Sequence, residues 1–178
     1  MSVTSAEAAL LGLLSEGAKH PYHIEKDVQY RDMRFWTELS MSAIYKALTK
    51  LEFMNFVEST TEISEENRAR KVYQLTPDGM LAFKEKLTEL LKEPEHLRWQ
   101  ADIAFYNLAV FTPEEQVNLL SAYKEAILKS IQSYRELEAF MQEGECSKYH
   151  LSVSLRPIYL MEGELKWVDD FIGQIKNP

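Results

Sequence analysis

The chain has 178 residues, a length that suits one or two domains. Its composition, 46% hydrophobic and 27% charged, fits a globular protein and excludes a disordered or collagen-like chain. The single cysteine, Cys146, excludes an intramolecular disulfide and a multi-cysteine zinc site. The first apolar run lacks the features of a signal peptide, and no apolar stretch reaches the roughly 18 residues of a membrane span. We therefore expect a reduced, cytoplasmic protein with no membrane contact.

Charge is distributed unevenly along the chain. The net charge of −8 by itself argues against a nucleic-acid binder, which usually has a basic surface. Residues 1–76 hold 9 basic and 11 acidic groups, whereas residues 77–178 hold 11 and 17. The acidic excess therefore belongs to the second part, and a DNA-binding surface in the first part would have to be local.

Two helices are predicted in the first 31 residues. The first begins at a capping box formed by Thr4 and Glu7, and Gly17 favours its end. The second has Pro21 in its first turn and runs to about Arg31. Its expected inward residues are Tyr22, Ile24 and Val28.

A third helix is predicted from Ser40 or Ser42 to Asn55, which can adopt the left-handed conformation that ends a helix. Its expected buried stripe consists of Ile44, Ala47, Leu48 and Leu51. The opposite face carries polar side chains, namely Tyr45, Lys46, Thr49 and Lys50.

After the third helix, the sequence pattern changes from one typical of a helix to one typical of β-strands. Residues 57–63 and 70–75 are short segments rich in β-branched residues, and a polar loop separates them, which predicts a hairpin. Thr76 and Pro77 then start another helix, which we expect to end near Lys92.

The remainder has a helical pattern throughout. Residues 96–110 form one apolar segment, and a long helix is predicted from Thr112 to Gly144. A second apolar stripe covers residues 151–175, and Pro157 within it is expected to kink or restart the helix.

The order of elements predicts a mainly α protein. Three helices and a two-stranded wing are typical of a winged helix-turn-helix domain, which we place at residues 1–93 together with a linker helix. We expect residues 94–178 to form a second, helical domain.

Three motifs in order resemble the PadR family of bacterial transcriptional regulators. They are residues 10–22, residues 42–51, which are similar to that family's recognition helix, and residues 70–79, which are similar to its returning wing strand. The chain has Pro21 and Asn55 where the family often has glycine, and both suit the local backbone. The resemblance implies a homodimer joined by its C-terminal helical domain. It also implies repression of a promoter and, in many members, release from DNA by phenolic acids or hydrophobic drugs.

The third helix and the wing supply the candidate DNA contacts. At the helix start, Ser40, Met41 and Ser42 are expected to reach bases or backbone, because the N-terminal end of a recognition helix enters the major groove. Phosphate contacts are expected from Tyr45, Lys46, Thr49 and Lys50 on the helix and from Arg68, Arg70 and Lys71 on the wing. A solvated polar helix face and an ordinary charged hairpin, weakened by Glu65 and Glu66, are the alternatives.

The second part supplies the candidate partner and effector contacts. The expected dimer interface comprises Leu120, Tyr123, Ile127, Ile131, Leu165, Trp167 and Phe171. Arg98 and Trp99 are the candidate effector site, because an aromatic acid would find a stacking surface and a positive charge there. Core packing is the alternative for these apolar and aromatic residues.

The sequence indicates neither catalysis nor a cofactor. It contains no nucleophile elbow and no phosphate-binding loop, and its four histidines have no ligand spacing that predicts a metal site. We therefore expect a DNA-binding regulator, a repressor released by a small aromatic or drug-like effector, and not an enzyme. The alternative is a winged-helix module that binds another protein.

Overall fold

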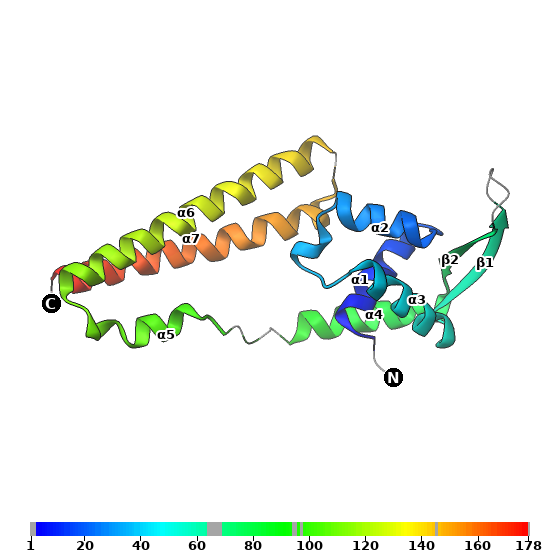
Figure 1. Ribbon diagram of the computed structural model, residues 1–178, viewed down its shortest axis with the longest axis horizontal. Helices are drawn as coiled ribbons and strands as arrows, with labels where there is room; N and C mark the ends of the chain where they lie inside the picture. Colours follow the sequence, from blue (N-terminus) through cyan, green and yellow to red (C-terminus); the bar gives the residue numbers. More distant parts are fainter. Residues whose placement is uncertain (1–2, 64–68, 94–95, 97, 145, 178) are drawn as a thin grey trace. The chain divides into compact units, whose positions relative to one another are not determined.

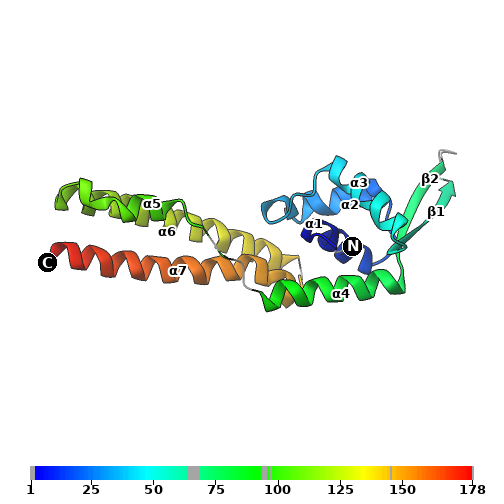
Figure 2. The ribbon, with the colours of Figure 1, turned by 90° about the horizontal axis from the view of Figure 1, so that it is seen from below.

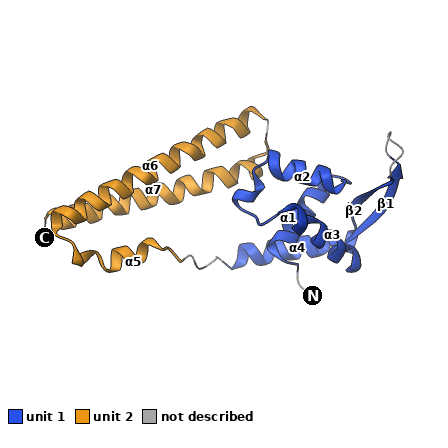
Figure 3. Cartoon of the chain, viewed as in Figure 1, with its two compact units in different colours: residues 1–96 blue, residues 97–178 orange. Residues whose placement is uncertain are grey.

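The computed structural model describes residues 3–63, 69–93, 96, 98–144 and 146–177. They form two compact units, residues 1–96 and 97–178 (Figure 3). The division falls after residue 96, where the sequence placed it after residue 93. Among the described residues, no helix has the length and apolar character that crossing a membrane requires.

Unit 1 is a helical core with a hairpin (Figure 1). Its elements are α1 (Ser5–Ser15), α2 (Pro21–Tyr30), the 3₁₀ helix η1 (Met33–Phe35), α3 (Met41–Phe53), β1 (Val57–Ile63), β2 (Ala69–Leu75) and α4 (Pro77–Lys92). The strands are antiparallel, with Val57 opposite Leu75 and Thr61 opposite Lys71. The mainly α fold with a winged helix-turn-helix is thereby confirmed.

The predicted helix starts and ends in unit 1 are confirmed. Thr4 and Glu7 form a reciprocal capping box, in which the Glu7 carboxylate accepts the Thr4 N–H at 2.9 Å. Thr76 caps α4 by accepting the Gly79 N–H at 3.0 Å. Asn55 has a φ of 57°, in the left-handed region that ends α3. These local signals fix where the helices lie along the chain.

Leucine, isoleucine and valine side chains fill the core of unit 1. The fully buried ones are Leu10, Leu11, Leu14, Ile24, Val28, Leu39, Ile44, Leu48, Leu51 and Val57. Tyr22, predicted to face inward, is instead 50% exposed. Ile24 and Val28 lie four residues apart on the buried side of α2, and Tyr22 falls outside that stripe.

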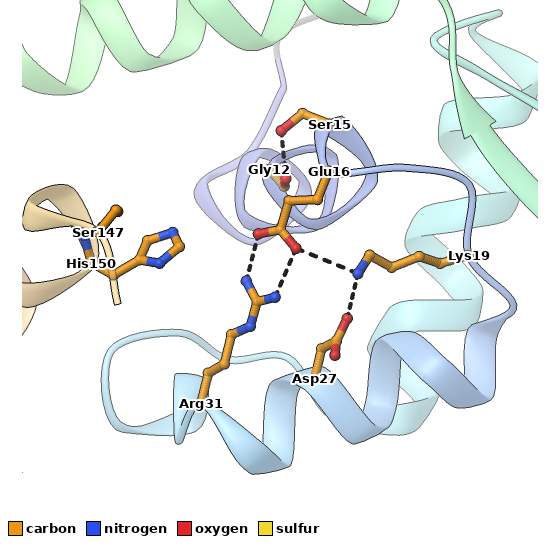
Figure 4. Close-up of polar contacts among 8 residues, drawn as sticks. All are labelled: Gly12, Ser15, Glu16, Lys19, Asp27, Arg31, Ser147 and His150. Carbon is orange, nitrogen blue, oxygen red and sulfur yellow. Dashed lines mark hydrogen bonds and ion pairs between the residues drawn. The ribbon is translucent and has the colours of Figure 1, made fainter. Parts of the chain in front are cut away.

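Ion pairs tie α1 to α2 (Figure 4). Glu16 follows α1 and accepts from the Arg31 guanidinium at 2.7 Å, whereas Lys19 contacts Asp27 at 2.6 Å. The backbone of Lys19 also exchanges two hydrogen bonds with Tyr73, which attaches the α1–α2 connection to β2. The helical core and the hairpin therefore form one packed unit.

Unit 2 is built on two long antiparallel helices that lie side by side (Figures 1 and 2). Its elements are α5 (Ala101–Tyr106), the 3₁₀ helix η2 (Leu108–Val110), α6 (Pro113–Glu143) and α7 (Lys148–Lys176). Thr112 and Glu115 form the capping box that starts α6, and Gly144 ends it, as predicted.

Pro157 was predicted to kink or restart the last helix; the restart does not occur, because α7 continues through Pro157. A proline inside a helix removes one backbone hydrogen bond. Its neighbour Ile158 is buried between α6 and α7, and this packing outweighs the missing bond.

Candidate nucleic-acid interface

The outer side of α3 presents a polar surface opposite a fully buried stripe. Ile44, Leu48 and Leu51 have no exposed surface, so they fix which side of the helix faces outward. We call the outward side the α3 face; it consists of Ser40, Ser42, Tyr45, Lys46 and Thr49, all of which are exposed. Met41 is half-buried beside it.

Hydroxyl groups gather at the start of the α3 face. Ser40 is the N-cap, and its Oγ accepts the Ala43 N–H at 3.2 Å. The Oγ atoms of Ser40 and Ser42 are 3.1 Å apart. Both hydroxyls remain exposed, and this end of a recognition helix is the one that reaches base edges.

The connection before α3 holds the helix in place. Arg34 contacts both oxygens of the nearly buried Glu25 carboxylate, at 2.7 and 2.8 Å, and its Nε donates to the Leu39 carbonyl at 2.9 Å. Gln29 donates to the same carboxylate at 2.7 Å. Charge-assisted bonds of this kind are stronger than neutral ones, so the start of α3 is rigidly attached to α2.

Lys46 is the cation of the α3 face that stays available. No described residue forms an ion pair or a hydrogen bond with its ammonium group. Lys50 differs, because its Nζ lies 2.7 Å from the Glu7 carboxylate and its side chain is only half-exposed. A lysine whose charge is already neutralised gains less from a phosphate than a free one.

The wing cations have contacts of their own. Lys71 on β2 lies 3.3 Å from the Glu52 carboxylate at the end of α3, and its ammonium is 5.8 Å from the centre of the Tyr73 ring. Arg70 is exposed and lies close enough to His20 to affect its titration. Arg68 falls outside the described residues.

In addition to burial, charged and polar groups of α3 and β2 shift the pKa of Tyr73, and groups of β2 and α2 shift the pKa of His20. Burial raises the pKa of Tyr73. The neighbouring Lys71 acts to lower this pKa, whereas Glu52 and Tyr45 act to raise it. The pKa of His20 is lowered, first by burial and then by Arg70 and His23.

Sequence reasoning missed a group of exposed side chains on α2. Lys26 lies 4.7 Å from the centre of the Tyr22 ring, and His23 is exposed beside them. The spacing of four residues between Tyr22 and Lys26 was a usable signal, because such residues meet on a helix surface.

The predicted dimer residues divide into two groups. Leu120, Ile127 and Ile131 are buried between α6 and α7 of a single chain, where they leave little surface for a partner. Tyr123, Leu165 and Phe171 are half-buried, and Trp167 is 41% exposed. Their assignment to an interface stays a prediction.

Aromatic rings join α5 to the long helices. Phe105 meets Trp167 with 4.8 Å between ring centres and Tyr123 with 5.4 Å, and the Tyr123 hydroxyl donates to Glu164 at 3.2 Å. The opposite side of this short segment is apolar and open; it carries Ile103, Tyr106 and Val110, which are 71%, 90% and 78% exposed.

The predicted effector residues lie before α5. Arg98 and Trp99 are both exposed, and 52% of the Trp99 surface is accessible. Among the described residues, no aromatic ring contacts the Trp99 indole. In the same part of the chain, no group of three or more histidine, cysteine or acidic side chains is placed to hold a metal ion.

Comparison with known proteins gives one family and several similar folds. Residues 10–85 match the model of the transcriptional regulator PadR-like family. No curated protein matches the chain.

Several solved structures are similar to the chain over almost its full length. Bacillus subtilis PadR in complex with operator DNA has 20% identity and a TM-score of 0.75, covering 95% of this chain and 98% of that one. The same protein with p-coumaric acid has 18% identity and a TM-score of 0.76, covering 97% and 96%. The Vibrio cholerae virulence activator AphA has 19% identity and a TM-score of 0.66, covering 97% and 98%.

Proposed function

We propose that the protein is a regulator of the PadR-like family, whose model matches residues 10–85, and that it binds operator DNA in a sequence-specific way and represses transcription. One observation carries the proposal, namely the α3 face. Its exposed hydroxyls and the available ammonium of Lys46 lie opposite a fully buried stripe, on a helix attached at its start by Arg34.

The start of α3 and the rest of the α3 face have different roles in DNA binding. Ser40, Met41 and Ser42 reach base edges in the major groove, where sequence is read. Tyr45, Lys46 and Thr49 hold phosphates, which positions the helix. Arg68 and Arg70 of the wing add phosphate contacts. Lys50 and Lys71 can bind a phosphate only after they release the carboxylates of Glu7 and Glu52, respectively.

We propose that the working form is a homodimer joined through unit 2. Ile103, Tyr106 and Val110 of α5 and η2 are largely exposed, and exposed apolar side chains that gather in one short segment favour an interface. A two-fold dimer places two recognition helices roughly 34–36 Å apart, so the operator is near-palindromic. Light scattering of the full chain at micromolar concentration should give a dimer, and a monomer would contradict this arrangement.

We propose a small aromatic acid as the effector that releases the DNA, with Arg98 and Trp99 as its contacts. The support is a relative of similar fold that was solved with p-coumaric acid, together with the exposed indole and guanidinium of these two residues. As a regulator of transcription, and not an enzyme, the protein acts in the cytoplasm, where bacterial DNA is held.

The decisive experiment is a binding titration of the full chain against duplexes from the region upstream of its own gene and neighbouring genes. Operator binding should weaken steeply with salt, because phosphate neutralisation releases counterions. Adding p-coumaric acid should release the DNA, and a promoter fusion should give the direction of regulation.

The net charge of −8 favours one alternative, a winged-helix module that binds a protein partner through the same surface. The two functions differ in salt dependence. A chain that fails to bind any duplex at low salt would favour the protein partner.

A further inference from the structure

Glu52 connects the recognition helix to both strands of the wing. It lies at the end of α3, and its Oε1 accepts the hydroxyl of Ser59 on β1 at 2.5 Å. Both of its oxygens also contact the Lys71 ammonium on β2, at 3.4 and 3.3 Å. Three elements that belong to the DNA-binding surface thus meet at one carboxylate.

The hairpin register places these partners on the same side of the wing. Ser59 pairs with Tyr73 and Thr61 pairs with Lys71, so the side chains of Ser59 and Lys71 leave the sheet on one face. Glu58 and Gln74 belong to the opposite face by the same alternation. The contact between α3 and the wing therefore involves a defined face of the hairpin.

The chemistry around the Glu52 carboxylate is that of an anion-binding position. A hydroxyl donor and an ammonium donor are the groups that also hold a phosphate oxygen on DNA. Both Lys71 and Glu52 retain exposed surface, so an exchange of partners needs no rearrangement of the core.

We propose that Glu52 competes with DNA phosphate for Lys71 and so sets how much positive charge the wing contributes to DNA binding. The inference rests on the proposed function and deepens it. While the pair is intact, Lys71 adds little to phosphate neutralisation, which then depends on Lys46 and on the wing arginines. Glu52 thus limits sequence-independent affinity.

The variant Glu52→Gln separates charge from position. Its amide oxygen still accepts the Ser59 hydroxyl, so the link between α3 and the wing remains, whereas the attraction for Lys71 is lost. The matched control is Glu58→Gln, which changes the net charge equally but lies on the face of the hairpin opposite to Lys71.

The experiment measures binding of the full-length protein to an operator duplex and to a random duplex by fluorescence anisotropy at several salt concentrations. Glu52→Gln should bind both duplexes up to about fivefold more tightly near 0.1 M salt, the upper range for an exposed ion pair. Its log–log salt slope should become steeper by about one, the contribution of one further neutralised phosphate. Glu58→Gln should keep the wild-type slope.

Lys71→Ala supplies the second arm, which does not depend on the folding of the Glu52 variant. Because Lys71 is already neutralised, its removal should reduce the salt slope much less than Lys46→Ala does. The double variant Glu52→Gln/Lys71→Ala should behave as Lys71→Ala alone.

Each failure has a distinct signature. A wild-type chain that binds neither duplex at low salt overturns the proposed function and this inference with it. If the wild-type chain binds DNA but the Glu52→Gln and Glu58→Gln variants have the same salt slope, only the inference is overturned and the proposed function stands. A Glu52→Gln variant with weakened binding and a normal melting temperature also overturns it, because Glu52 would then only orient the wing.

Discussion

The carboxylate of Glu7 lies 2.7 Å from the ammonium of Lys50, and this contact joins the first turn of α1 to the last turn of α3. The same carboxylate accepts the backbone N–H of Thr4, so one nearly buried side chain both starts a helix and anchors another. Lys50, predicted to bind phosphate, thus also has a structural partner.

Lys50→Met should lower the free energy of unfolding by about 1–3 kcal/mol, because it leaves the buried Glu7 carboxylate without its charged donor. Lys46→Met is the matched control on the same helix and should change it by less than about 0.5 kcal/mol. Urea denaturation of both variants measures the difference. Equal stabilities would show that the Glu7–Lys50 contact contributes nothing.

The contact also predicts a pH dependence. Burial acts to raise the pKa of Glu7, but the hydrogen bonds from Lys50 and Thr4 outweigh it and hold the pKa below its ordinary value. A carboxyl of lowered pKa stabilises the fold above its ordinary pKa, and this stability is lost as the pH falls through the folded value. The unfolding free energy of the wild type should therefore fall in this acid range. Glu7→Gln should show a smaller fall, and parallel curves would contradict the assignment.

Gly79 allows the close approach of α4 to the end of α3 and the start of β1. A Cβ atom there would lie 1.9 Å from the Phe56 carbonyl oxygen, which is backbone and cannot move aside freely. Gly79→Ala should therefore destabilise unit 1 by about 1–3 kcal/mol or more. Gly163→Ala is the control, because an added Cβ would meet no atom within 4 Å beyond its neighbours and its own helix backbone, and alanine favours the helix by roughly 1 kcal/mol. Thermal melts compare the two, and a stable Gly79→Ala variant would refute the close packing.

Lys46→Ala tests the α3 face. Because its ammonium has no partner among the described residues, it should neutralise one phosphate on any duplex. Its removal should weaken binding to operator and random DNA alike and reduce the salt slope by about one. Lys84→Ala, on the exposed side of α4, should leave the slope unchanged. A folded Lys46→Ala variant with the wild-type slope would exclude the phosphate contact.

Trp99→Ala tests the effector site. The indole is half-exposed, so its loss should change the melting temperature little, whereas a packed tryptophan would cost about 3–5 kcal/mol. Ligand-free operator binding should persist and release by p-coumaric acid should disappear. Thermodynamic linkage requires the two effects to be equal. If the ligand weakens DNA binding by a given factor, DNA must weaken ligand binding by the same factor. Tyr159→Ala, another exposed aromatic, is the control. A normal ligand response in Trp99→Ala would eliminate this role.

The winged-helix pattern could be predicted because its signals act over a few residues. Thr4, Thr76 and Thr112 each accept a backbone N–H three residues ahead, and Asn55 adopts the left-handed backbone that its short side chain tolerates. The buried stripe of α3 follows from helical periodicity alone, so the sequence also predicted which side of that helix faces outward.

The partners of the cations came only from the tertiary structure. Lys50 and Glu7 are 43 positions apart, and Lys71 and Glu52 are 19 apart, so no local spacing reveals either contact. The continuity of α7 through Pro157 and the burial of Ile127 within one chain likewise depend on how α6 packs against α7. Backbone hydrogen bonds close within four residues and can be read along the chain. The partner of a charge or of an apolar side chain is decided by which residues folding brings near it, and this determines which lysines are already paired.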